Sequence, residues 1–135
     1  MSLVLIRQAL ETHLNSITPT LSTAWENVPF KPVTNEPYQQ VNLVVADNKD
    51  ITVSDASYLT VGFMQVLLVY PISTGTKLAA LRADLISSTF QRGLQLTAGD
   101  LTTEINKTPK LAPAFIDGAT YKLPVTIHFK TFISL

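Results

Sequence analysis

The sequence contains no cysteine. The chain can therefore form no disulfide, supply no thiolate nucleophile and hold no cysteine-ligated metal. Charge is also scarce, at 15% of the residues, and ten Lys and Arg residues balance ten Asp and Glu residues. Because no net charge is available to attract a polyanion, the composition argues against direct binding of nucleic acid or of an anionic membrane.

No long apolar run is present either. The N-terminal segment begins with apolar residues, but Arg7, Glu11 and His13 interrupt it well short of the roughly 20 apolar residues that a membrane span needs. No basic segment precedes it, so we expect no export signal and no membrane partner. A chain of this length fits one domain, which we expect to cover residues 1–135.

Hydrophobic residues are abundant, at 46% of the chain, in contrast to the low charge. A monomer of this size usually keeps more charge on its surface. One interpretation is that neighbouring subunits cover part of an apolar surface. The other is a well-buried β-rich domain, and composition alone does not separate the two.

Two segments have the apolar spacing of amphipathic helices. In residues 2–17 the apolar positions are Ile6, Ala9, Leu10, His13, Leu14 and Ile17. Pro19 ends this segment, and Thr74 or Thr76 can cap the start of the second. In the second segment the stripe that we expect to face the core consists of Leu78, Leu81, Leu85, Ile86 and Phe90. Arg82 lies off that stripe, and Gly93 suits a left-handed residue after the helix.

The β signals lie between and after these helices. Residues 23–30 suggest a short edge strand, because prolines surround them. Residues 38–46 alternate as a strand does, and residues 59–70 are apolar on both faces, which predicts a central strand. Alternation returns in residues 101–105 and 121–129. Residues 47–57 are polar and without period, so we expect a loop there.

The pair Asp117-Gly118, with β-prone residues on both sides, predicts a hairpin with a type I′ turn. That register places Pro124 opposite Leu111. Because proline cannot donate to a sheet ladder, we expect a bend or bulge that divides the hairpin into an outer arm and an inner part.

These elements predict an α+β fold of two layers. We expect a mostly antiparallel sheet of four to five strands with two helices on one face, in the order α-β-β-β-α-β-β.

The residues that usually carry chemistry are few. His13 lies on the apolar stripe of the first helix, and His128 lies on the polar face of the last strand, neither at a catalytic spacing from a serine or carboxylate. The acidic segment 47–55 resembles a calcium loop only in composition, since Thr52 and Tyr58 stand where that loop requires Gly and Glu. Residues 73–77 have one glycine and lack the phosphate-loop spacing. We therefore expect no enzyme, no cofactor and no metal site.

Four lysines, Lys107, Lys110, Lys122 and Lys130, fall within the last hairpin. They are spread along it rather than clustered with stacking aromatics, as nucleic-acid binding would require. Protection of a sheet edge against unwanted pairing explains them equally well.

Two segments are candidates for subunit contacts. Residues 46–60 are too long for a tight hairpin and include Ile51, Val53, Tyr58 and Leu59, which would be unfavourable in solvent. The outer arm presents Leu111, Ala112, Phe115 and Ile116, and a two-stranded ribbon cannot bury both of its faces. The alternative for each segment is that it folds back onto its own domain.

Five stretches together resemble a family of tail-terminator and minor tail proteins of long-tailed phages. They are TAWENVPF, PYQQVNLVVA, FMQVLLVYP, GTKLAALRADLISSTFQRG and DGATYKLPVTIHF. The resemblance implies a structural virion subunit without catalytic residues that forms a ring, commonly of six copies. Such a ring caps the head-proximal end of the tail tube and joins it to the head connector, after assembly in the host cytoplasm.

The resemblance leaves two alternatives open. One is a head–tail connector subunit or another minor tail protein, which also assembles in rings. The other is a small ligand-binding domain unrelated to phage, which predicts a monomer with one well-formed concave pocket.

Overall fold

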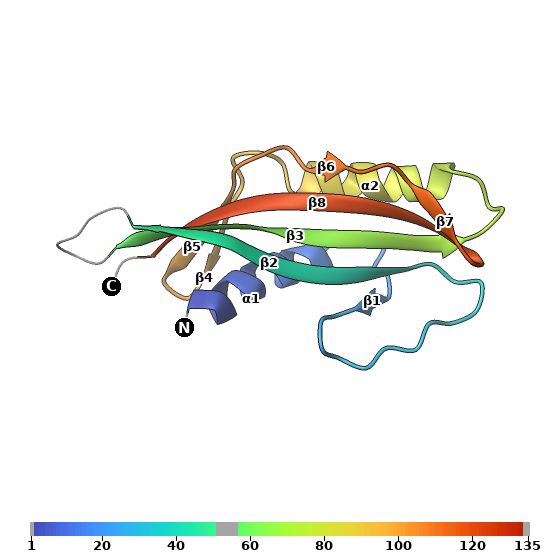
Figure 1. Cartoon of the computed structure of the whole chain (residues 1–135), viewed down its shortest axis with the longest axis horizontal. Coiled ribbons are helices and arrows are strands. Elements are labelled where there is room, and N and C mark those ends of the chain that lie inside the picture. The colour runs from blue at the N-terminus through green and yellow to red at the C-terminus, as the bar shows by residue number, and fades with distance from the viewer. Residues whose placement is uncertain (1, 51–56, 134–135) are drawn as a thin grey trace.

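The structure of the chain is a computed structural model that describes residues 2–50 and 57–133. The elements, in chain order, are α1 (Ser2–Asn15), β1 (Thr23–Ala24), β2 (Tyr38–Asp50), β3 (Tyr58–Pro71), α2 (Lys77–Thr89), β4 (Gln95–Ala98), β5 (Leu101–Ile105), β6 (Lys110–Leu111), β7 (Phe115–Asp117) and β8 (Thr120–Ile133). Three long strands, β2, β3 and β8, form the body of the molecule (Figure 1).

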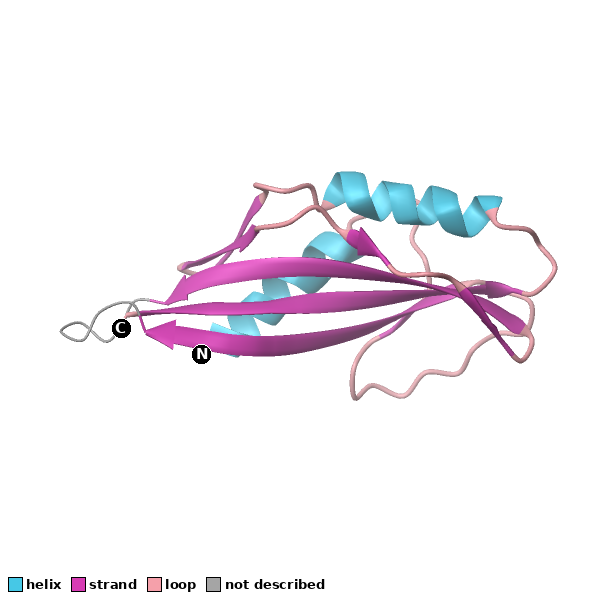
Figure 2. Ribbon diagram, turned by 45° about the horizontal axis from the view of Figure 1, so that its top comes forward, coloured by secondary structure: helices cyan, strands magenta, loops and turns pink. Residues whose placement is uncertain are grey.

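One curled sheet contains all the strands, in the order β1-β2-β3-β8-β5-β4, with β6 and β7 paired to β8. Of the edge strand expected at residues 23–30, only Thr23–Ala24 forms a strand, β1, at the edge of the sheet. β1 pairs with β2 in parallel, whereas every other pair is antiparallel. β3 is central, as its two apolar faces predict. The ribbon views show both helices on the same, concave side of this sheet (Figure 2).

The core lies between the helices and the sheet. From α1, the side chains of Ile6, Leu10 and Leu14 are at most 1% exposed, as their spacing predicts. They belong to one cluster with Met64 of β3 and Ile127 of β8, which face each other across the two strands. The α+β class and the two-layer arrangement are therefore confirmed.

The sheet contains more strands than the four or five expected, because several are short. β4 follows α2 and pairs with β5 through a turn in which Gly99 has a φ of +60°. Its four residues have only one buried position, Ala98, so they carry little apolar alternation to reveal a strand.

The loop expected at residues 46–60 is largely a strand pair. β2 continues to Asp50 and pairs with β3 down to Tyr58, with a register shift between Val45 and Asp47. These residues are exposed on β2, so their sequence shows no buried face. Backbone pairing needs no buried face, which is why polarity alone gave the wrong expectation here.

The hairpin at Asp117-Gly118 is confirmed, but its turn lies one residue later than expected. Asp117 pairs with Thr120, so the turn residues are Gly118 and Ala119. Only Gly118 of the two has a positive φ, as a type II′ turn requires rather than a type I′ turn. Leu111 consequently pairs with Val125, not with Pro124.

The expected break between the two parts of this hairpin is present. Pairing to β8 stops between β6 and β7, and the register differs on the two sides of the gap. The outer part is not a free ribbon, however, because β8 pairs with β3 along its whole length, from Thr120 to Ile133.

The helix α2 turns a different face to the core than its leucines suggest. Its buried residues are Ala79, Arg82, Ala83 and Ile86, whereas Leu78 is 56% exposed and Leu81 is 53% exposed. The helix carries two apolar stripes, and the one with alanines allows a closer approach of the helix to the sheet. The expectation that Leu78 and Leu81 face the core is therefore wrong.

The end of α2 also differs from expectation. The helix ends at Thr89 and Phe90 is its C-cap, so Gly93 lies beyond the position that normally takes a left-handed glycine. Gly93 does have a positive φ of +94°, and its N–H donates to the carbonyl of Ile105 at 2.7 Å. It serves the connection to β4 rather than the helix cap.

The outer edge of β2 is partly closed by other groups. The N–H of Gln39 donates to the carbonyl of Ser22, and the N–H of Leu43 donates to the carboxylate of Glu26. Glu26 also forms an ion pair with Arg7 of α1 at 3.3 Å. Further along the same strand, Asp47, Lys49 and Asp50 place charges on the edge.

Candidate assembly surfaces

Of the residues expected at a subunit contact, Tyr58 and Leu59 begin β3 and are half-buried. Tyr58 lines a shallow hollow together with Leu3 and Val45. Ile51 and Val53 lie outside the described residues. Contact of this end of the sheet with a neighbouring subunit stays a prediction.

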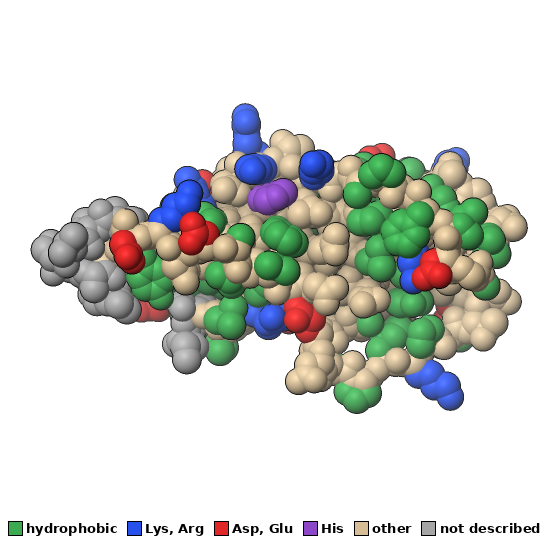
Figure 3. Space-filling view, viewed as in Figure 1, with side chains coloured by type: hydrophobic (Ala, Val, Ile, Leu, Met, Phe, Trp, Pro, Cys, Tyr) green, Lys and Arg blue, Asp and Glu red, His purple; other side chains and the backbone are tan. Residues whose placement is uncertain are grey.

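The second expected set forms an exposed patch on β6 and β7. Leu111 is 47% exposed, Phe115 46% and Ile116 64%. We call these three residues the strand patch; Ala112, expected with them, is half-buried beside it. Figure 3 shows hydrophobic side chains gathered over this end of the outer sheet face.

A charged pair lies beside the strand patch. Asp117, which follows Ile116, accepts a hydrogen bond from the ammonium group of Lys122 at 2.9 Å. The side chain of Asp117 is 65% exposed, so this carboxylate remains open to solvent and to a partner.

The two expected surfaces do not form one site. β8 carries the partners of both, since Lys122 lies opposite Phe115 and Ile133 lies opposite Tyr58. Eleven residues of extended strand separate those partners, which corresponds to about 35 Å. A subunit could therefore use the two surfaces toward different neighbours.

The structure also shows a third surface, which the sequence did not predict. A groove of about 320 Å³ lies between α2 and the segments around residues 19–21 and 37. We call it the α2 groove; its lining is Pro19, Thr20, Leu21, Pro37, Tyr70, Leu78, Leu81, Arg82 and Leu85. The exposed leucines of α2 form one of its walls.

Arg82 is the charged residue of this lining. Its side chain is buried, one guanidinium nitrogen donates to the carbonyl of Pro19, and its Nε has no hydrogen-bond partner within the described part of the chain. Burial lowers the pKa of Arg82, and burial also raises the pKa of the Tyr70 hydroxyl while the charge of Arg82 opposes that rise. Because arginine stays charged in proteins, a buried cation whose Nε is unpaired and shielded from solvent lines the groove.

On the outer face of the sheet, His128 stacks obliquely on Phe63, with ring centroids 5.9 Å apart. Partial burial and the charges of Lys107 and Lys110 lower the pKa of His128. Lysine and arginine side chains are visible beside a histidine on this face (Figure 3). These surroundings therefore favour the neutral form of His128 in the folded chain.

This environment predicts a pH dependence of stability. Because the folded chain has the lower pKa, the stability associated with neutral His128 is present above the ordinary histidine pKa of about 6.5 and is lost as the pH falls through the folded value. We expect His128→Gln, which cannot titrate, to lose less stability than the parent chain between about pH 7 and about pH 5 in urea unfolding. Equal losses in the two proteins would contradict this reading.

Among residues 2–50 and 57–133, no group of three His, Asp or Glu side chains lies close enough to hold a metal ion. No helix in that same part of the chain is long and apolar enough to cross a membrane. Two of the four lysines considered for nucleic-acid binding are in ion pairs, Lys122 with Asp117 and Lys130 with Glu104.

The sequence was matched to one protein family. Residues 5–129 match the family described as phage tail terminator protein. No curated protein has a sequence that matches this chain.

Two solved structures share the fold. The first, of a protein that carries only a sequence identifier as its name, is 24% identical with a TM-score of 0.73 and covers 97% of this chain and 96% of that chain. The second comes from the virion of a native gene transfer agent particle; it is 13% identical with a TM-score of 0.65 and covers 98% of this chain and 97% of that chain.

Proposed function

Because the chain belongs to the phage tail terminator protein family, a family of structural proteins of the virion tail, we propose that it forms a ring on the head-proximal end of the tail tube. The ring contains several copies, six in the simplest case. One face of the ring binds the last ring of the tube. The other face does not bind a further tube subunit, so polymerisation stops there, and it binds the head connector. Assembly takes place in the host cytoplasm.

The observation that carries this proposal is the family match over residues 5–129. The surface supports it, because Leu111, Phe115 and Ile116 on the strands and Leu78 and Leu81 on α2 are each at least 46% exposed. Apolar surface of this kind marks contact sites for other proteins. The likeness of the fold to a chain of a gene transfer agent virion agrees with a role in particle assembly.

Capping requires complementary surfaces and no making or breaking of covalent bonds. We therefore propose no catalytic step, no cofactor and no metal. The partners that we propose are further copies of the chain, the tail tube protein and the head-completion or connector protein.

The test is tail length in a phage whose copy of this gene is ended by an early stop codon. Without a terminator, tube polymerisation has no fixed end, so we expect overlong tails of variable length without attached heads in electron micrographs. Supplying the chain from a plasmid should restore normal length and head attachment. Tails of normal length that lack heads would instead favour a connector role.

A further inference from the structure

We propose that the α2 groove of one copy receives the strand patch of the next copy, so that each contact in the ring joins two different surfaces. This inference rests on the proposed ring and names the surfaces that close it.

The form of the strand patch argues for a groove as its partner. Phe115 pairs across from Lys122, and Ile116 pairs across from Tyr121. Because successive strand residues point to opposite faces, these two exposed side chains lie on opposite sides of β7. A flat partner could cover one of them, whereas a groove can enclose the end of the strand from both sides.

The α2 groove is apolar, as the strand patch is. Leu78, Leu81 and Leu85 form an apolar wall on one side, and Pro19 and Pro37 belong to the rest of its lining. Leu78 and Leu81 are the more exposed of the three leucines and have no function in the subunit's own core. Covering them removes apolar surface from water, which favours association.

The charges of the α2 groove and of the strand patch are also complementary. In the groove, the buried Arg82 has an Nε without a hydrogen-bond partner in residues 2–50 and 57–133. On the strand patch, Asp117 directly follows Ile116 and has an exposed carboxylate. A carboxylate accepts strongly from a guanidinium group, so seating Ile116 in the groove brings a suitable acceptor toward Arg82.

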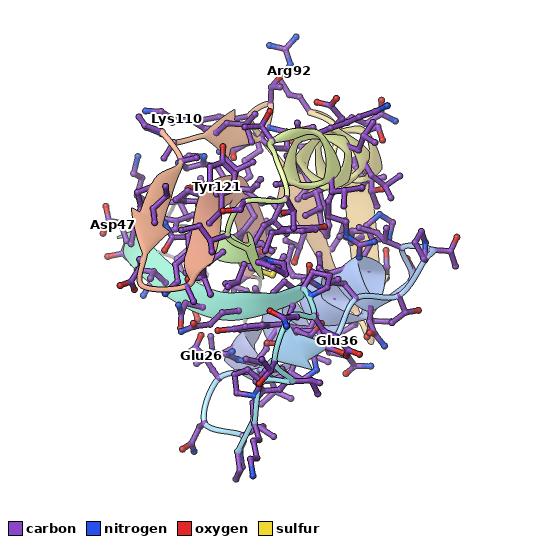
Figure 4. The ribbon with its side chains drawn as sticks, turned by 90° about the vertical axis from the view of Figure 1, so that its right-hand side faces the viewer. Glu26, Glu36, Asp47, Arg92, Lys110 and Tyr121 are labelled. Carbon is purple, nitrogen blue, oxygen red and sulfur yellow. The ribbon has the colours of Figure 1, made fainter. Side chains whose placement is uncertain are left out.

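The two surfaces consist of different residues, as a head-to-tail contact needs. Tyr70 of the groove lining pairs with Tyr121 of β8, and Tyr121 pairs with Ile116 of the strand patch, so both surfaces lie at the end of the sheet that faces the viewer in Figure 4. The contact leaves a free groove on one end copy and a free strand patch on the other. Such a head-to-tail contact continues until the ring closes, whereas a self-matching contact would stop at two copies.

The absence of cysteine allows a direct test. Leu81→Cys and Ile116→Cys chains, of which one carries a tag that changes its mass, are supplied together to the phage with the disabled gene. Tails isolated from these cells are treated with a short bismaleimide. We expect a cross-linked dimer that contains one chain of each kind, and no dimer in tails built from either variant alone.

Val4→Cys is the matched control, because Val4 is 61% exposed but lies on α1 outside both surfaces. Paired with either variant it should give no dimer. A dimer of two Leu81→Cys chains would overturn the proposal in favour of a self-matching contact. Absence of the mixed dimer from tails of normal length would overturn it outright.

The two proposals fail in different ways. If the disabled gene leaves tail length and head attachment normal, the proposed function is wrong. If tails are overlong without the chain, and the variants restore their length without giving the mixed dimer, only the contact between groove and patch is wrong.

Discussion

Phe129→Ala is expected to lower the free energy of unfolding by about 3–5 kcal/mol, the usual cost of removing a phenyl ring from a packed core. Phe129 is fully buried in β8, and its strand neighbours on the two sides are Gly62 of β3 and Ile105 of β5. The ring therefore fills space between three strands and the helices, and the cavity left by alanine cannot collapse without moving the sheet. Urea unfolding at several protein concentrations measures the loss separately from any effect on assembly.

Phe132→Ala is the matched control. Phe132 lies three residues further along the same strand but is 52% exposed. Its removal opens no internal cavity, so we expect a loss below about 1 kcal/mol. Similar losses for the two variants would show that Phe129 is not a centre of the core.

Gly62→Ala has the second largest expected effect, although it adds a single methyl group. A Cβ atom at Gly62 would lie 2.2 Å from the carbonyl oxygen of Val44 and 3.0 Å from the ring of Phe129. The first of these is backbone of the neighbouring strand, which cannot rotate away. We expect a loss of about 1–3 kcal/mol, as for other overpacked core positions, measured by the same urea unfolding.

The double variant Gly62→Ala with Phe129→Ala separates the two obstacles. Removing the ring relieves one contact but leaves the carbonyl of Val44 in place. We therefore expect the double variant to be less stable than Phe129→Ala alone. If Gly62→Ala cost nothing in the background without the ring, the clash with Val44 would be refuted.

Much of this fold follows from the sequence where burial imposes a period. The spacing of Ile6, Leu10 and Leu14 predicts α1 and its buried face, and the apolar residues of 59–70 predict the central position of β3. The Asp-Gly pair predicts a hairpin at the right place. Its turn is displaced by one residue, because a glycine with positive φ serves a type II′ turn as well as a type I′ turn.

The sequence is a poorer guide where two patterns compete or where none is needed. Helix α2 has leucines on one stripe and Ala79 and Ala83 on another, and composition favours the leucines while close packing favours the alanines. At residues 47–50 the strand is exposed, so its polarity says nothing about pairing. Because the wrong face of α2 was predicted to be buried, the α2 groove could not be predicted. Because residues 47–50 were predicted to be a loop, the length of the β2–β3 pair could not be predicted either.

The candidate contact residues were also only partly predictable from the sequence. Leu111, Phe115 and Ile116 are exposed on the described surface, as an interface at this position requires, although β8 is supported by β3 along its length. Contact through these residues, and through Tyr58 and Leu59, stays a prediction. The exposure of Leu81 could be found only once the helix was placed on the sheet.

The carboxylate of Glu26, held by Arg7 and bound to the N–H of Leu43, has a consequence for the free subunit. An unprotected outer strand allows copies to join side by side into fibrils. Here a side chain takes the place that a foreign strand would need, and the charges of Asp47, Lys49 and Asp50 discourage pairing further along. We therefore expect free copies of the chain to resist edge-to-edge aggregation.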